Sequence, residues 1–101
     1  MRRGVCKNIL YDNAIELIKN NDVYIIDVRE KEEITKNDNK ILEWSINIPI
    51  NKLTSEIKNF VPNKNQIILV FCSTGSRSIF ACQILADMGY NKVYNLYGGI
   101  H

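Results

Sequence analysis

The sequence predicts an α/β domain built around a mostly parallel β-sheet. Two apolar runs carry this prediction, Val23–Val28 and Gln66–Phe71, because strands buried on both faces of a parallel sheet are almost continuously hydrophobic. Segments with apolar residues at helical spacing alternate with these runs, as in repeated strand–helix units. The chain has 101 residues, the length of one compact domain, so we expect a single domain over residues 1–101.

The first half of the chain is expected to form one helix and two strands. Apolar residues at helical spacing predict a helix over residues 12–19, with Asp12 or Asn13 as its N-cap. The β-branched and aromatic run Val23–Val28 predicts a buried strand. The alternation of polar and apolar residues in Ser45–Ile50 predicts a second, shorter strand.

The second half continues the alternation of helices and strands. The spacing of Leu53, Ile57 and Phe60 predicts a short helix. The run Gln66–Phe71 is typical of the central strand of a parallel sheet. The last two elements expected are a helix marked by Ile79, Cys82, Leu85 and Ala86, ending at Gly89, and a strand over Lys92–Leu96.

Composition and charge exclude several classes of function. The net charge is +2 and the basic residues are scattered, which gives no basic face for a nucleic acid. The apolar runs are far shorter than the ~20 residues that cross a bilayer. The N-terminal residues lack the apolar core of a signal peptide. We therefore expect a cytoplasmic protein, without nucleic-acid or membrane partners.

The cysteines do not follow the pattern of a disulfide framework or of a metal site. They are Cys6, Cys72 and Cys82, an odd number at irregular spacing. Cys82 falls on an apolar helix face and is expected in the core, whereas Cys6 is expected to be incidental; a redox role for either stays open. The one histidine, His101, is expected to be solvated, so no metal site is predicted.

The segment that begins at Cys72 has the features of an anion-binding loop. It lies between the predicted central strand and a predicted helix, whose first amides lack internal partners and carry partial positive charge. Gly75 can adopt the positive φ that lets successive amides converge. Polar groups around it can add donors and charge, namely the hydroxyls of Ser73, Thr74 and Ser76 and the guanidinium of Arg77.

Such a loop favours a thiolate at Cys72. The pKa of a free cysteine is about 8.5, and helix termini with nearby cations lower it to roughly 3.5–7.5. We therefore predict that Cys72 is a nucleophile near neutral pH. The alternative is a buried cysteine that only fills space at the end of a strand.

Five motifs of the chain, in order, resemble those of rhodanese domains. They are DVRE (Asp27–Glu30), SINIP (Ser45–Pro49), LVFCSTGSRS (Leu69–Ser78), LADMGY (Leu85–Tyr90) and VYNLYGGI (Val93–Ile100). The resemblance extends from about Ile9 to Ile100. It implies a five-stranded parallel sheet with helices on both faces and the activity of a sulfurtransferase.

The resemblance also implies a mechanism for this loop. Cys72 would take a sulfane sulfur from a donor such as thiosulfate, hold it as a persulfide, and pass it to cyanide, a thiol or a protein, such as a sulfur-carrier protein. Residues Ser73 to Arg77 would position the anionic donor. No cofactor is implied. We expect a monomer.

Other residues of the motifs have two interpretations or depart from the family. Asp27 is expected to be either part of the site's charge network or a buried anchor, and Arg29 to pair with Glu30 or another carboxylate. The acidic and basic run after them, residues 30–40, is expected to form an exposed helix and loop. Ile41 stands where rhodaneses commonly have histidine and Trp44 where they have glycine, so the local turn is expected to differ.

Two other functions compete with sulfur transfer. Phosphatases and arsenate reductases of related fold have five residues between the cysteine and the arginine of the loop, whereas here four separate Cys72 from Arg77. A shorter loop suits a single sulfur better than a phosphate ester. Non-catalytic binding modules of the same fold commonly lose the loop cysteine or its glycine, and this chain keeps Cys72 and Gly75.

Overall fold

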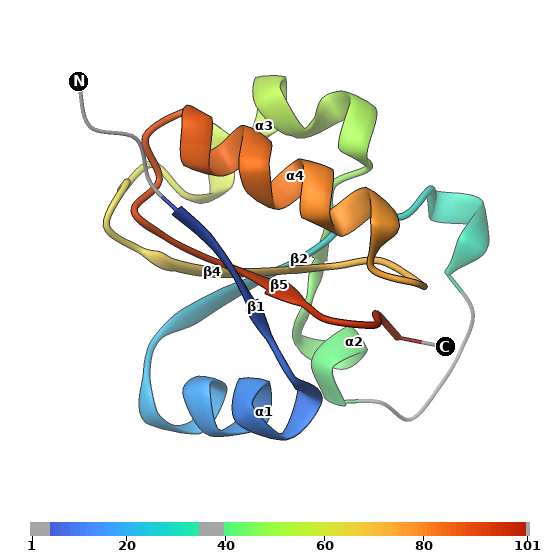
Figure 1. The fold of residues 1–101 in the computed structure, drawn as a ribbon. Helices are drawn as coiled ribbons and strands as arrows, with labels where there is room; N and C mark the ends of the chain where they lie inside the picture. The colour runs from blue at the N-terminus through green and yellow to red at the C-terminus, as the bar shows by residue number, and fades with distance from the viewer. Residues whose placement is uncertain (1–4, 35–39, 101) are drawn as a thin grey trace.

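The computed structural model describes residues 5–34 and 40–100 and confirms the α/β prediction. Its sheet consists of β1 (Val5–Ile9), β2 (Val23–Asp27), β3 (Ile46–Asn47), β4 (Ile67–Phe71) and β5 (Lys92–Leu96). The strand order is β1-β5-β4-β2-β3 and every pairing is parallel. All five carboxyl ends therefore meet at one edge of the sheet, on the right in Figure 1.

Helices cover both faces of the sheet. They are α1 (Tyr11–Asn20), α2 (Lys40–Trp44), α3 (Leu53–Phe60) and α4 (Ser76–Asp87), with 3-10 turns η1 (Lys31–Glu33) and η2 (Ile50–Lys52). Figure 1 shows α3 and α4 on one face and α1 and α2 on the other. This arrangement is the one that the rhodanese resemblance implies.

The apolar run of β4 is continuous because its side chains alternate between two cores. Ile68 and Val70 belong to the buried cluster on the α3 and α4 side, together with Cys72. Leu69 and Phe71 belong to the cluster on the α1 and α2 side. Each side chain is fully buried, so the strand holds the chain rigidly up to the point where the Cys72 loop begins.

Several boundaries match their predictions and others do not. The helix expected from Leu53 to Phe60 has those bounds in α3, and the last strand has those of β5. The strand expected over residues 45–50 shrinks to β3. The predicted N-cap of α1 is wrong, because Leu10 occupies that position without a side-chain cap and Asp12 lies in the first turn.

The strand β1 and its disulfide correct the expectations for two cysteines. Cys6 lies on β1, an edge strand beside β5, and forms a disulfide with Cys82 on α4, with a Cα–Cα distance of 5.5 Å. Cys6 is therefore not incidental, although Cys82 is buried as expected. A bond across 76 residues stabilises the fold on the order of 4 kcal/mol by restricting the unfolded chain.

Two consequences follow from this pairing. Among the described residues, Cys72 is the free cysteine, so the chain presents one thiol for chemistry. Disulfides persist mainly in oxidising compartments, so this disulfide counts against the predicted cytoplasmic location. The location stays a prediction. In the two described stretches of chain, no helix has the length and apolar character needed to cross a membrane.

The two departures from the rhodanese pattern lie on α2. Ile41 is fully buried in the core on the α1 and α2 side. Trp44 ends α2 with about half of its surface exposed, so its ring lies outward and does not enter the space of a glycine. Residues 35–39 of the run expected to be exposed, and His101, lie outside the described residues.

Candidate active site

The parallel sheet brings the two predicted clusters of polar residues to one edge. Asp27 ends β2 and is the register partner of Phe71, which ends β4. Cys72 follows Phe71 directly, and η1 follows β2 after three residues. The carboxyl edge of a parallel sheet is where α/β proteins bind their ligands. The candidate site is therefore the turn from β4 to α4 together with the segment after β2.

The turn from β4 to α4 surrounds the Cys72 sulfur with donors. The backbone N–H groups of Gly75 and Ser78 donate to Sγ, at 3.0 Å and 3.4 Å between heavy atoms. The hydroxyl of Ser78 lies 3.5 Å from Sγ. Gly75 precedes the first turn of α4 with φ +94°, the positive φ that the sequence predicts for it. Cys72 itself is fully buried.

These contacts favour the thiolate over the thiol. Burial raises the pKa of Cys72, because it removes the charged form from water. Hydrogen bonds from the Ser78 hydroxyl and from the amides of Ser78, Thr74 and Gly75 act the other way and outweigh it, so the pKa is lowered. The sulfur is thus buried among groups that stabilise negative charge.

The other hydroxyls of the loop have different partners. Ser73 Oγ accepts a hydrogen bond from Arg77, 3.2 Å away. The hydroxyls of Thr74 and Ser76 bond to each other at 3.0 Å on the surface. The hydroxyl that contacts Sγ is that of Ser78, which sequence reasoning did not single out although it follows Arg77 directly.

Arg77 forms an ion pair that was not predicted. Its guanidinium donates to both carboxylate oxygens of Glu33 on η1, with 2.8 Å from Nη2 to Oε2. The N–H of Glu30 also donates to the Glu33 carboxylate. The hydrogen bond from Arg77, followed by the one from Glu30, holds the pKa of Glu33 at about 2, and the pair raises the pKa of Arg77. The positive charge expected to face a donor is therefore already paired.

Asp27 and Arg29 form a buried pair below this surface. Arg29 Nε and Nη2 donate to the two Asp27 oxygens at 3.0 Å and 2.9 Å, and the Arg29 N–H donates to Oδ1 at 3.0 Å. Asp27 is 1% exposed and Arg29 6%. The hydrogen bond that Arg29 donates to Asp27 raises the pKa of Arg29. Arg29 thus pairs with Asp27 and not with Glu30, and Asp27 has the geometry of an anchor.

The C-terminal turn packs directly against the Cys72 loop. The N–H of Ile100 donates to the Cys72 carbonyl at 2.9 Å. A Cβ on Gly99 would lie 2.5 Å from the Cys72 and Ser73 carbonyl oxygens, and Gly99 has φ +69°. Glycine is therefore required for this close approach. The GGI motif noted in the sequence thus supports the loop by its backbone.

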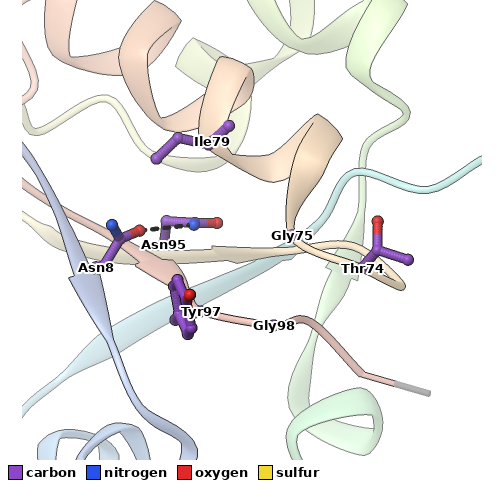
Figure 2. Close-up of a pocket in the computed structure, with 7 residues that line it drawn as sticks. All are labelled: Asn8, Thr74, Gly75, Ile79, Asn95, Tyr97 and Gly98. Atoms are coloured by element: carbon purple, nitrogen blue, oxygen red, sulfur yellow. Dashed lines mark hydrogen bonds between the residues drawn. The ribbon is translucent and has the colours of Figure 1, made fainter.

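A cavity of about 330 Å³ opens beside the loop, toward β1 and β5. Figure 2 shows its lining, which consists of Asn8, Thr74, Gly75, Ile79, Asn95, Tyr97 and Gly98. Asn8 and Asn95, from adjacent strands, are joined there by a hydrogen bond of 2.9 Å. None of these strand residues was predicted as part of a site.

Among the described residues, no group of three or more potential ligand side chains is placed to hold a metal ion.

Comparison with known proteins identifies the family to which the chain belongs. The family profile of the rhodanese-like domain matches residues 10–101. The chain therefore belongs to the rhodanese-like domain family. Among curated proteins it is similar to the thiosulfate sulfurtransferase PspE of Escherichia coli, with 37% identity over 72% of this chain and 67% of that protein.

Solved structures support the same assignment. A rhodanese-related protein from Thermoplasma volcanium matches with a TM-score of 0.74 and 30% identity, over 92% of this chain and 85% of that one. A protein from Rhodopseudomonas palustris, described as a possible tyrosine phosphatase, matches with a TM-score of 0.80 and 25% identity, over 93% and 76%. The fold is thus common to proteins that are described with different activities.

The close approach of the C-terminal turn generates a first prediction. Gly99→Ala should disturb the Cys72 loop, because the new Cβ would meet its backbone at 2.5 Å. Gly98→Ala is the matched control, since Gly98 also has a positive φ, +82°, but open space at its Cβ position. Both variants should lose about 1–2 kcal/mol from the left-handed backbone. Only Gly99→Ala should lose more and change the rate at which iodoacetamide alkylates Cys72.

Urea denaturation and the alkylation rate at one pH measure the two effects. Equal stability losses in the two variants, with unchanged alkylation of Cys72 in both, would show that the turn does not support the loop.

Proposed function

We propose that this protein is a sulfurtransferase that carries sulfur as a persulfide on Cys72. The observation that carries the proposal is the surroundings of a buried free thiol, where two backbone N–H groups donate to Sγ and the Ser78 hydroxyl lies 3.5 Å from it. Hydrogen bonds from a fixed backbone stabilise developing negative charge without reorganisation. A relative named as a thiosulfate sulfurtransferase supports the same reaction.

The reaction divides into two transfers in which the sulfur atom moves without its bonding electrons. The Cys72 thiolate attacks the outer sulfur of thiosulfate, a new S–S bond forms, the old one breaks, and sulfite leaves with the electron pair. The persulfide anion on Cys72 then lies at the positive end of α4, near the amides that hold the thiolate. An acceptor such as cyanide or a thiol attacks the outer sulfur, and the thiolate returns.

The buried position of Cys72 means that a donor has to gain access. The ion pair between Arg77 and Glu33 bridges the loop and η1 at the surface, with both side chains about one third exposed. We propose that an anionic donor takes the place of the Glu33 carboxylate on Arg77. Glu33 then acts as a competitor for the donor's negative charge, and Arg77 contacts the donor only when this pair opens.

Two alternatives are less well supported by the geometry. The phosphatase signature has five residues between the loop cysteine and arginine, whereas four separate Cys72 from Arg77 here, so the loop is one residue shorter than a phosphate ester requires. The comparison with a possible tyrosine phosphatase keeps this activity as an outcome of the test. A non-catalytic module does not require a cysteine whose pKa is lowered.

The intermediate provides the direct test of sulfur transfer. Incubation with thiosulfate should add one sulfur, roughly 32 Da, to the protein, and cyanide or a thiol should remove it. Peptide mapping should place it on Cys72, because Cys6 and Cys82 are joined in a disulfide. The Cys72→Ser variant should neither gain mass nor release thiocyanate. The measurement is intact mass before and after each step.

The same preparation separates sulfur transfer from phosphatase activity. Hydrolysis of an aryl phosphate that depends on Cys72, with no sulfur gained from thiosulfate or an organic polysulfide, would contradict the proposal in favour of the phosphatase. A full transfer rate in Cys72→Ser would contradict the assignment of the nucleophile.

A second prediction concerns the competition at Arg77. Glu33→Gln should weaken the pair and lower the KM for thiosulfate, by up to about tenfold if one charge-assisted hydrogen bond is made available. The KM for a neutral donor, such as an organic trisulfide, should change little. Because the pKa of Glu33 is about 2, its carboxylate is charged at any practical assay pH, and acidification to pH 5 should not imitate the variant.

Glu32→Gln is the matched control for this prediction. Glu32 adjoins Glu33 on η1 and is also exposed, so its removal changes the net charge equally. An equal fall in the thiosulfate KM in both variants would assign the effect to general charge and not to release of Arg77.

A further inference from the structure

A chain of buried hydrogen bonds leads from the Cys72 sulfur to the cavity beside the loop. The thiol group of Cys72 lies 3.5 Å from Ser78 Oγ. The Ser78 hydroxyl donates to Asn95 Oδ1, 2.5 Å away. Asn95 Nδ2 donates in turn to Asn8 Oδ1 at 2.9 Å, the bond that Figure 2 shows as a dashed line. Ser78 is fully buried and Asn95 is 3% exposed, so this chain is shielded from solvent up to Asn8.

The Ser78 hydroxyl has one proton and several possible acceptors. Besides Asn95 Oδ1, the Gly75 carbonyl lies 3.2 Å from Ser78 Oγ. When Cys72 is a thiol, its S–H donates to Ser78 Oγ, and the hydroxyl proton is free to point to Asn95. When Cys72 is a thiolate, the same hydroxyl can stabilise it only by turning its proton from Asn95 to Sγ.

The orientation of the Asn95 amide decides this competition. Because Nδ2 is bound to Asn8, Oδ1 faces Ser78 as an acceptor. The opposite orientation would present an N–H donor, which would leave the hydroxyl proton for Sγ. Asn8 and Asn95 are register partners on β1 and β5, so the sheet places the Asn8 carboxamide where its Oδ1 accepts from Asn95 Nδ2.

We propose that Asn95 is a positioning residue that directs the Ser78 hydroxyl and thereby limits how strongly the Cys72 thiolate is stabilised. This proposal rests on the proposed role of Cys72 as the nucleophile. A thiolate that is held less tightly is a stronger nucleophile toward the sulfur donor, because nucleophilicity falls as the thiol pKa falls. Asn95 acts through Ser78 and does not touch the sulfur.

Charged groups near Cys72 provide a constant background for this effect. Arg77 on α4 interacts electrostatically with Cys72 and is paired with Glu33 on η1. Asp27 and Arg29, after β2, are paired with each other. Glu30 also interacts electrostatically with Arg77, and on the side of β5 the titratable residue Tyr97 lines the cavity. None of these groups changes in the variants below.

The test is a double-mutant cycle on the pH dependence of Cys72 alkylation by iodoacetamide. Asn95→Leu removes the acceptor and frees the hydroxyl, which should prefer the charged sulfur over the Gly75 carbonyl. The midpoint of alkylation should fall by about half to one pH unit. At a pH below the midpoint, the variant should then hold about three- to tenfold more Cys72 as thiolate than the wild type. Ser78→Ala should raise the midpoint. In the Ser78→Ala background, Asn95→Leu should have no further effect.

Controls separate this effect from a loss of packing. Asn91→Leu replaces an exposed asparagine whose amide bonds to Asn65, and it should leave the midpoint unchanged. If Asn95→Leu does not fold, as judged by thermal melting, Asn95→Ala takes its place in the cycle with the same expected shift.

Two results would overturn the proposal. One is a wild-type midpoint in both folded Asn95 variants. The other is a shift that persists when Ser78 is alanine, which would show that Asn95 does not act through the hydroxyl. Alkylation does not require sulfur transfer, so a failure of the proposed function would be seen separately, in the absence of the persulfide.

Discussion

The site depends on the hydrogen bonds that a tight turn directs at one buried sulfur. Cys72 follows the last four residues of β4, which are fully buried, and an unpaired thiolate there would be strongly unfavourable. The turn offsets this cost because Gly75, at positive φ, directs its own N–H and that of Ser78 to Sγ. A side chain at Gly99 would push the loop away. The thiolate that we propose as the nucleophile is thus stabilised largely by backbone geometry.

Two ion pairs lie around this turn without contacting the sulfur directly. The buried pair of Asp27 and Arg29 fixes the chain as it leaves β2, and the Asn47 amide donates to the carbonyls of both residues. The chain then enters η1, where Glu33 meets Arg77 across the site. The electrostatic properties of the loop therefore depend on three consecutive strands of the sheet, β2, β3 and β4.

The parts of the site that are local in sequence could be predicted. The buried strand that ends just before Cys72, the positive φ of Gly75 and the short helix α3 follow from composition and spacing within a few residues. The edge strand β1 was missed because three of its five residues are exposed and it lacks a clear apolar period. Its disulfide joins residues 76 apart, and no spacing rule predicts such a pair.

The contacts of the site that the sequence did not predict join residues that only the tertiary structure brings together. Glu33 and Arg77 are 44 residues apart, and Ser78 and Asn95 are 17 apart. Glu33 belongs to a run of charged residues that is typical of an exposed segment, and Asn95 lies in a strand whose other residues are mainly apolar. Only the parallel order of the sheet, which places β5 beside β4 and β1, shows that Asn95 lies within hydrogen-bond distance of Ser78 and Asn8.

The central claim is that the folded chain holds Cys72 as an anion more readily than water does. The direct measurement is an NMR titration of the Cys72 Cβ signal in protein labelled with 13C at cysteine Cβ, with the disulfide intact. We predict a midpoint below the value of about 8.5 for a free cysteine. The fold is then stabilised by the thiolate at high pH, and this contribution is lost as the pH falls through the midpoint. A midpoint at or above about 8.5 would contradict the account, because burial would then outweigh the donors of the loop.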